Sequence, residues 1–227
     1  MKKIRTEITK GEELRYISHL DYASAIERSI RRTKMPVAFS EGFNPHMKIS
    51  FASALALGVT SATEYMDVEF KTDVDLDEFC EKIKQELPPG VQLLQAKPLE
   101  GKHQALMAMI DLATYQITIP FTGEFSAVEK AVAEYNQAET VMYTRYSPKK
   151  GKKEIEIKQY MSQPVKVNQK NDDIIFDVVI DVTPAGSIKP GEVLKTLVEN
   201  FAMPIDVAEA FIHRIGLYSG GKTPIEL

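Results

Sequence analysis

The chain has 227 residues, of which 44% are hydrophobic and 26% are charged, which is ordinary for a globular protein. The formal net charge of −4 excludes a protein that binds nucleic acid through overall positive charge. A single cysteine, Cys80, excludes an intrachain disulfide, a cysteine-rich zinc site and an iron–sulfur cluster held by this chain alone. Because the sequence has no run of about 18 apolar residues and no apolar signal segment, we expect a cytoplasmic protein without membrane contact.

The first hundred residues predict the element order β-α-β-β-α-β. Alternating or extended patterns indicate strands at residues 2–9, 47–53, 64–71 and 91–96. Helices are predicted from about Leu20 to Thr33 and from Asp75 to Leu87, where apolar residues recur at helical spacing. Ser18 is suited to cap the first helix, and proline follows each helix.

The second half predicts the same order with one strand more. A strand is expected around residues 115–119, and others at 140–146, 153–160, 174–182 and 207–217, although the start of the last one is also compatible with a helix. Helices are expected at residues 125–135 and 194–201. The sequence therefore predicts an α+β protein of two tandem ferredoxin-like units, the second with an added hairpin. A single mixed sheet crossed by four helices stays open as an alternative.

The predicted division places a first unit, with the candidate site, at residues 1–100. Residues 101–113 are expected to link it to a second unit, with a C-terminal tail, at residues 114–227. The tail carries Gly216 to Thr223, which match the phosphate-loop pattern. We reject that assignment because Pro224 follows at once, whereas a phosphate loop requires a helix at its end.

Polar and aromatic residues gather between Arg15 and Gly58, around predicted loops. Arginines at positions 28, 31 and 32 are spaced to share one helix face, and with Lys48 they suit binding of phosphates. Aromatic side chains beside arginines are typical of proteins that stack single-stranded RNA bases. We expect substrate binding by Arg15, Ser18, His19, Asp21, Arg28, Arg31, Arg32, Gly42, Phe43, Asn44, His46 and Lys48.

The same segment contains groups that can transfer protons. His19, His46, Tyr16 and Lys48 are the candidate catalytic residues, because metal-free RNA cleavage requires a base, an acid and a cation. A recognition loop without chemistry is the interpretation we favour. We expect no bound metal, and His19, Asp21 and His46 would be the ligands of a minor alternative. A second basic segment, residues 145–153, predicts a hairpin tip that either increases solubility or contacts phosphate.

These residues resemble a known family. The segment Arg15-Tyr-Ile-Ser-His-Leu-Asp, the arginine-rich helix, Phe39-Ser-Glu-Gly-Phe-Asn-Pro-His and Ile49-Ser-Phe-Ala are similar to the radical-SAM-linked protein family. Weaker similarity continues at residues 154–160 and 186–190. That family is bacterial, has no assigned activity, and is encoded beside, or fused to, a radical SAM protein.

The resemblance implies a partner rather than a reaction. SAM and the iron–sulfur cluster are expected only on the partner, and no cofactor is expected on this chain. Family members are often encoded near genes for ribosomal proteins and RNA processing, which implies RNA (tRNA or rRNA) as the substrate class. We therefore expect a non-catalytic RNA-binding accessory protein that presents a substrate for modification or processing. Two alternatives stay open: a metal-independent endoribonuclease resembling CRISPR repeat-processing enzymes, and a protein-docking module that never contacts nucleic acid.

Overall fold

The computed structural model describes residues 2–101, 103–147 and 151–227. It is an α+β structure with antiparallel strand pairing, and it divides into two compact units. Unit 1 comprises Met1–Ile110 together with Arg214–Leu227, and unit 2 comprises Asp111–His213. No helix within the described ranges is long and apolar enough to cross a membrane.

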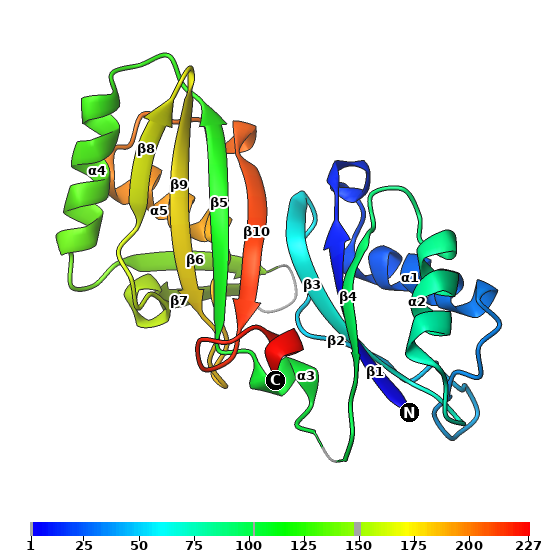
Figure 1. The fold of residues 1–227 in the computed structure, drawn as a ribbon. Helices are drawn as coiled ribbons and strands as arrows, with labels where there is room; N and C mark the ends of the chain where they lie inside the picture. The colour runs from blue at the N-terminus through cyan, green and yellow to red at the C-terminus, as the bar shows by residue number, and fades with distance from the viewer. Residues whose placement is uncertain (1, 102, 148–150) are drawn as a thin grey trace. The chain divides into compact units, whose positions relative to one another are not determined.

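Unit 1 contains an antiparallel sheet in the order β4-β1-β3, with β2 paired to β3 (Figure 1). Two longer helices, α1 and α2, alternate with these strands. The elements are β1 (Lys3–Lys10), α1 (His19–Arg32), β2 (Ile49–Phe51), β3 (Val59–Glu69), α2 (Leu76–Glu86) and β4 (Leu93–Pro98), with the short helices η1 (Glu12–Leu14), α3 (Leu106–Met109) and η4 (Pro224–Glu226).

The core of unit 1 lies between its sheet and its two longer helices. Alternation on β1 buries Ile4 and Ile8, and the helical spacing of Tyr22, Ile26 and Ile30 buries one face of α1 against them. Phe79 and Ile83 are the buried residues of α2 and belong to the same core. Burying one such side chain stabilises the fold by about 1.5–3 kcal/mol. This packing fixes where α1 begins, and so positions the residues at its N-terminus.

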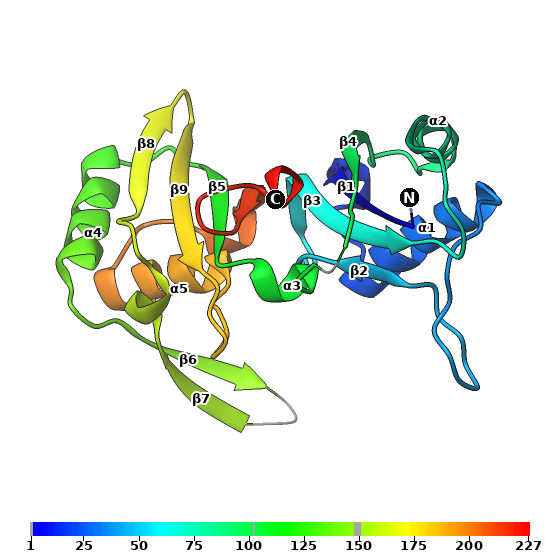
Figure 2. The ribbon, with the colours of Figure 1, turned by 60° about the horizontal axis from the view of Figure 1, so that its bottom comes forward.

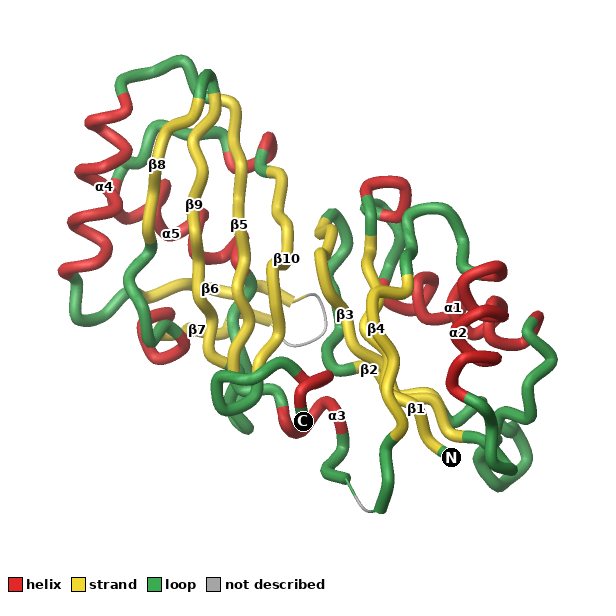
Figure 3. Tube along the Cα trace, in the orientation of Figure 1, coloured by secondary structure: helices red, strands yellow, loops and turns green. Residues whose placement is uncertain are grey.

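Unit 2 contains antiparallel strands with β9 between β5 and β8, and a separate two-stranded sheet of β6 and β7 (Figure 3). The strand β10 begins in unit 2 and ends in unit 1. The elements are β5 (Leu112–Pro120), α4 (Phe125–Gln137), β6 (Met142–Ser147), β7 (Gly151–Glu156), η2 (Ile157–Tyr160), β8 (Lys166–Lys170), β9 (Asp173–Asp181), α5 (Pro190–Phe201), η3 (Val207–Glu209) and β10 (Phe211–Tyr218).

The predicted helices are present; α1, α2 and α4 begin and end within about two residues of the expected positions, whereas α5 begins at Pro190, a full turn before its expected start. The strand β8 was not predicted, because Lys166–Lys170 is mostly exposed and has no apolar alternation. The predicted strand at 153–160 stops at Glu156, whose carboxylate accepts hydrogen bonds from the backbone N–H groups of Lys158 and Gln159 and so starts η2. The residues before β10 form the short helix η3 rather than strand.

The division of the chain differs from the expected one at its C-terminal end. Residues 214–227 belong to unit 1, and the expected linker, 101–113, contains α3 and the start of β5. Pro224 is buried, and its carbonyl accepts a hydrogen bond of 2.9 Å from the guanidinium of Arg5 on β1. No α-helix follows the glycines of the phosphate-loop pattern; the three-residue helix η4 stands there instead. The tail is thus an integral part of unit 1.

Candidate functional site

The start of α1 is built by residues 15–21, called here the 15–21 segment. Ser18 is the N-cap of the helix: its hydroxyl oxygen accepts a hydrogen bond from the backbone N–H of Asp21 and donates one of 2.7 Å to the Asp21 carboxylate. Capping of this kind contributes about 1 kcal/mol, and the acidic group at the first turn complements the helix dipole. The expected cap is therefore confirmed, and it engages two of the candidate binding residues.

The 15–21 segment is fastened to the residues that precede β3. The Arg15 guanidinium donates to the carbonyl of Gly58 at 3.0 Å, and the Gly58 N–H donates to the carbonyl of Arg15 at 2.9 Å. Gly58 has a φ of 82°, a conformation that favours glycine. Arg15 also lies over the ring of Tyr16, 5.1 Å from its centroid. Arg15 therefore helps to hold the segment in place, a role that its candidacy as a binding residue did not include.

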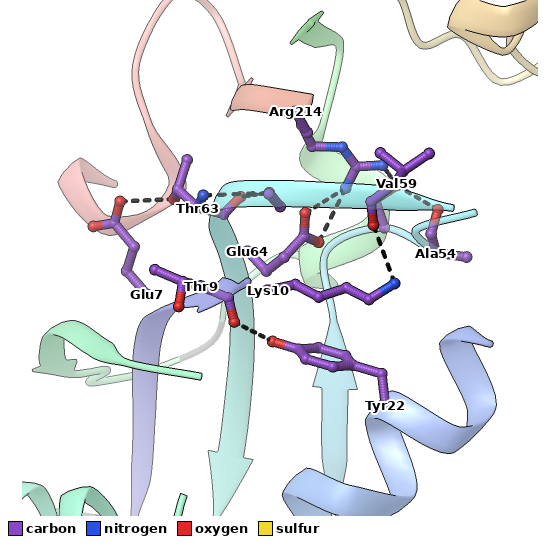
Figure 4. A network of polar contacts seen from close by, with 11 residues as sticks. Glu7, Thr9, Lys10, Tyr22, Ala54, Val59, Thr63, Glu64 and Arg214 are labelled. Carbon is purple, nitrogen blue, oxygen red and sulfur yellow. Dashed lines mark hydrogen bonds and ion pairs between the residues drawn. The ribbon is translucent and has the colours of Figure 1, made fainter. Parts of the chain in front are cut away.

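A fully buried lysine completes this attachment. The Lys10 ammonium donates to the carbonyls of Ile17 and Val59, at 3.3 and 3.1 Å, and so links the segment to the first residue of β3 (Figure 4). Burial lowers the pKa of Lys10, while the nearby Glu64 carboxylate acts in the opposite direction. Lys10 was not a candidate residue, because one lysine at the end of a predicted strand gives no signal in sequence.

Beside Lys10 lies a buried ion pair. The guanidinium of Arg214 donates to both carboxylate oxygens of Glu64, at 2.8 and 3.0 Å, and each side chain is only 3% exposed (Figure 4). These two residues are 150 positions apart in the sequence. Sequence motifs cannot predict this ion pair, because neither residue has characteristic neighbours in the sequence. Together with Lys10 it gives unit 1 a charged cluster beneath the start of α1.

His19 is partly buried in this environment. Its ring packs edge-on against Phe51 of β2, with ring centroids 5.5 Å apart. Burial lowers its pKa, an effect that Glu64 opposes and that Arg214 and Lys10 reinforce. The imidazole is therefore neutral near pH 7, as a general base or a hydrogen-bonding group requires.

Residues 40–46, the 40–46 loop, are held at their base and exposed at their tip. Phe39 and Met47 form an isolated bridge, Ser40 N–H donates to the His46 carbonyl at 2.8 Å, and His46 N–H donates to the Ser40 hydroxyl at 3.0 Å. Residues 41–46 are all exposed, and Phe43 is as exposed as an isolated side chain. Figure 2 shows the loop before β2 projecting from the rest of unit 1.

The three arginines of α1 have different environments. Arg32 forms an ion pair with Glu86 of α2 and also donates to the carbonyl of that residue and to Ser29. Arg28 and Arg31 are exposed, on the side of the helix opposite Ile26 and Ile30. Neither guanidinium group has a hydrogen bond or ion pair within the described part of the chain. The expected three-arginine face therefore reduces to two arginines available to a ligand.

The remaining candidate residues also differ in their surroundings. Lys48 lies 3.7 Å from the Glu69 carboxylate, and both groups are about half exposed. Tyr16 is 73% exposed, and Gly42 and Asn44 lie in the exposed 40–46 loop. Gly42 adopts a φ of 121° there. Within the described part of the chain, the side chains of His19 and His46 form no hydrogen bond or ring contact with each other. Among the described residues, no three His, Cys, Asp or Glu side chains are placed to hold a metal, and this includes His19, Asp21 and His46.

The other face of the unit 1 sheet is also occupied by internal contacts. Arg5 and Asp67 form a buried bidentate ion pair, at 2.8 and 3.1 Å. The Glu7 carboxylate accepts hydrogen bonds from Thr63 and from Tyr65, and burial raises the pKa of Tyr65 to about 12. Because these groups satisfy one another, this face offers few free polar atoms.

In unit 2 the described residues of the basic 145–153 segment lie on the paired strands β6 and β7. Arg145 of β6 pairs with Glu192 of α5 through two hydrogen bonds of 2.7 and 2.6 Å. Its pKa is raised mainly by the hydrogen bond to Glu192. Lys152 and Lys153 lie on β7, and residues 148–150 of the expected tip lie outside the described residues.

Comparison with known proteins assigns a family. Residues 3–190 match a family described as "Uncharacterized protein conserved in bacteria (DUF2344)", and the chain belongs to that family. The description names no activity, cofactor or partner. No curated protein matches the chain.

Two solved structures give only distant matches. One is a chain of a Cbf5-Nop10-Gar1 complex, with 9% identity and a TM-score of 0.44 over 95% of this chain and 48% of that chain. This chain therefore spans about half the length of that one. The other is an unknown protein from Galdieria sulphuraria, with 11% identity and a TM-score of 0.27 over 94% of this chain and 97% of that chain. Neither likeness supports a functional argument.

Proposed function

We propose that this protein is an RNA-binding accessory protein that presents its RNA to a partner radical SAM enzyme. One observation carries the RNA-binding part: unit 1 displays two unpaired arginines on α1 together with a supported loop whose phenylalanine is fully exposed. Cationic groups for phosphates and an exposed aromatic ring for a base are the two components of single-stranded RNA binding.

The phosphate-binding groups are Arg28 and Arg31. Both keep their guanidinium groups unpaired within the described residues, so binding a phosphate breaks no internal ion pair. Arg32 is excluded from this role because Glu86 already holds it. Lys48 is a weaker contributor, since Glu69 lies near its ammonium group.

The base-stacking group is Phe43. An exposed phenylalanine has no stabilising role within the fold, whereas the bonds between Ser40 and His46 hold together the base of the loop that carries it. Such preorganisation reduces the entropy that a ligand must overcome on binding. Asn44 and His46 on the same loop are placed to read the edge of a stacked base, and Tyr16 is a second exposed ring.

The radical SAM partner is inferred from the family resemblance of the 15–21 segment and the 40–46 loop. We propose that SAM and an iron–sulfur cluster reside on that partner, that the RNA is a tRNA or an rRNA, and that both proteins act in the cytoplasm. We further propose that each unit is ferredoxin-like, since the strand orders β4-β1-β3 and β5-β9-β8, with helices between the strands, are compatible with that fold.

The decisive experiment measures binding of a fluorescein-labelled single-stranded RNA at several salt concentrations. The wild-type chain is compared with the double variant Arg28→Ala/Arg31→Ala and with the control Lys84→Ala/Lys130→Ala, which removes two exposed lysines from α2 and α4. Each lost phosphate contact reduces the slope of log K against log salt by about 0.7 for a single strand. We expect a smaller slope and weaker binding for the arginine variant, and wild-type behaviour for the control.

Equal binding by the two double variants would contradict the role of α1. Absence of RNA binding by the wild-type chain, alone and with the radical SAM protein, would leave the protein-docking module as the better hypothesis. In that case Arg28→Glu should weaken the complex between the two proteins, which a pull-down with the purified partner measures.

An endoribonuclease is the second candidate, and the neutral, partly buried imidazole of His19 favours it. His46 or Tyr16 would have to supply the acid, although neither side chain contacts that of His19 within the described residues. Incubation with RNA tests this: products ending in 2′,3′-cyclic phosphate, lost in His19→Ala, support the enzyme, and intact RNA contradicts it.

A further inference from the structure

The β6–β7 hairpin of unit 2 borders a polar cavity that the proposed function does not use. The cavity has a volume of about 300 Å³ and lies between β7, η2 and the turn that precedes α5. A volume of this size is at the lower end of small-molecule sites. Its polar lining includes Arg145, Lys153, Glu154, Gln159, Tyr160 and Gly186.

Several lining groups are already satisfied by internal contacts. Arg145 binds Glu192, and the Ser187 hydroxyl donates to the Asp181 carbonyl at 2.9 Å. Both oxygens of the Glu156 carboxylate accept backbone N–H groups at the start of η2. These contacts hold the walls of the cavity in place, because they link β6 to α5 and fix the turn after β7.

Three other lining side chains have polar atoms without a partner. Within the described ranges, Lys153, Gln159 and Tyr160 make no side-chain hydrogen bond or ion pair. Lys153 is directly opposite Arg145 in the hairpin register, so both side chains lie on one face of the two strands. Lys152, its neighbour on β7, points to the opposite face and does not line the cavity.

The cavity combines donors with an acceptor and an aromatic ring. Lys153 supplies a cation, Gln159 an amide with a donor and an acceptor, and Tyr160 a phenol, whereas the Glu154 carboxylate lies with Thr144 on the other face of the hairpin and accepts from its hydroxyl at 2.7 Å. A bare phosphate would use only the cation, whereas a nucleotide has an anionic phosphate together with a base that offers polar edges and a flat face. The mixed lining therefore favours a nucleotide over a simple anion.

We propose that this cavity, the hairpin cavity, binds one nucleotide of an RNA strand. Lys153 contacts its phosphate, and Gln159 and Tyr160 contact the base. The proposal rests on the proposed function for its RNA strand and adds a second contact point in unit 2, where that function placed none.

The test uses two probes, a fluorescein-labelled poly(U) oligomer and the mononucleotides UMP and AMP, with the full chain. Lys153→Ala is compared with Lys152→Ala, which removes the same charge from the next position of the same strand but from the other face. Gln159→Ala is a second cavity variant that leaves the charge unchanged. Loss of one charge-assisted hydrogen bond predicts roughly a ten-fold rise in the Kd of Lys153→Ala for poly(U), and a smaller effect of Lys152→Ala.

Mononucleotide titrations followed by NMR separate this proposal from the proposed function. Shifts of the Gln159 side-chain amide on addition of UMP or AMP, absent in Lys153→Ala, support the hairpin cavity even if poly(U) does not bind. Wild-type poly(U) binding that is weakened by Arg28→Ala/Arg31→Ala, but equally by Lys153→Ala and Lys152→Ala, overturns the cavity and leaves the proposed function standing. Binding of neither probe overturns both.

Discussion

The 15–21 segment and the 40–46 loop have similar compositions, yet their residues are used in opposite ways. In the 15–21 segment, Arg15 is bonded to Gly58, Ser18 is bonded to Asp21 within the segment, and the buried Lys10 binds the carbonyl of Ile17. In the 40–46 loop, hydrogen bonds occur only at the base, and the six residues that follow Ser40 are exposed.

The difference indicates a division of labour within one stretch of polar sequence. Lys10 is buried and a buried polar group must be paired, so its hydrogen bonds fix Ile17 of the 15–21 segment against the start of β3. The exposed groups of the 40–46 loop carry no such cost, so the composition of the loop has no explanation in the stability of unit 1. The loop is therefore the better candidate for contact with a ligand, whereas the bonds of Lys10 and Arg15 hold the start of α1, which includes His19, in place.

The largest effect is expected from breaking the ion pair beneath the 15–21 segment. Arg214→Ala leaves the Glu64 carboxylate buried without its partner, and we expect the free energy of unfolding to fall by about 3–5 kcal/mol. Urea denaturation measures this. The exposed Arg28→Ala is the control, with a change within about 0.5 kcal/mol. Equal stability of the two variants would show that the Glu64–Arg214 pair has no structural role.

A smaller loss is expected when the lysine beneath the segment is replaced. Lys10→Met keeps the apolar volume but removes the donor to the carbonyls of Ile17 and Val59. We expect a loss of about 1–3 kcal/mol, the cost of leaving buried acceptors unpaired. Urea denaturation is again the measurement, with Lys84→Met on the exposed side of α2 as the matched control. A more stable Lys10→Met variant would indicate that burial of the ammonium group outweighs its two hydrogen bonds.

The pH dependence of stability tests the partial burial of His19 in the 15–21 segment. Burial lowers the pKa of folded His19 below its ordinary value of 6.5, so the unfolded chain binds more protons between the two pKa values. The contribution of His19 is therefore fully present above about pH 6.5 and is lost as the pH falls through the folded pKa. We expect His19→Gln to reduce the loss of unfolding free energy between about pH 7 and pH 5.

Urea denaturation at a series of pH values checks that prediction. The difference between His19→Gln and the wild-type chain should be constant above about pH 7 and should shrink below it. His213, whose pKa burial also lowers, stays in both proteins and contributes equally to each. Parallel curves over the whole range would contradict the lowered pKa of His19.

The smallest effect on stability is expected at the tip of the 40–46 loop. Phe43→Ser removes a fully exposed ring, so the free energy of unfolding should change by no more than about 0.5 kcal/mol. RNA affinity should fall about 5- to 150-fold, because stacking of one base contributes about 1–3 kcal/mol. Thermal unfolding and fluorescence anisotropy measure the two quantities. A large loss of stability would mean that the ring packs within the fold, contrary to the division of labour described above.

Much of the fold was predictable because its elements are locally encoded. The apolar spacing of Tyr22, Ile26 and Ile30, the Ser18 cap and the prolines after the helices predicted α1 and α2 to within a few residues. The strand β8 was missed because an exposed edge strand has little need of apolar alternation. The candidate site was predicted as one group, whereas the structure separates Arg32, held by Glu86, from the exposed Arg28 and Arg31.

The sequence by itself determined the α+β composition, the order of the helices and the segment that holds the candidate residues. These properties depend on periodicity and capping over a few neighbouring positions. Only the tertiary structure decided which polar residues are buried partners and which are free, because Glu64 meets Arg214 across 150 positions and Arg5 meets Asp67 across 62. Pairing at such separations depends on how the strands assemble, and no local pattern of residues encodes it.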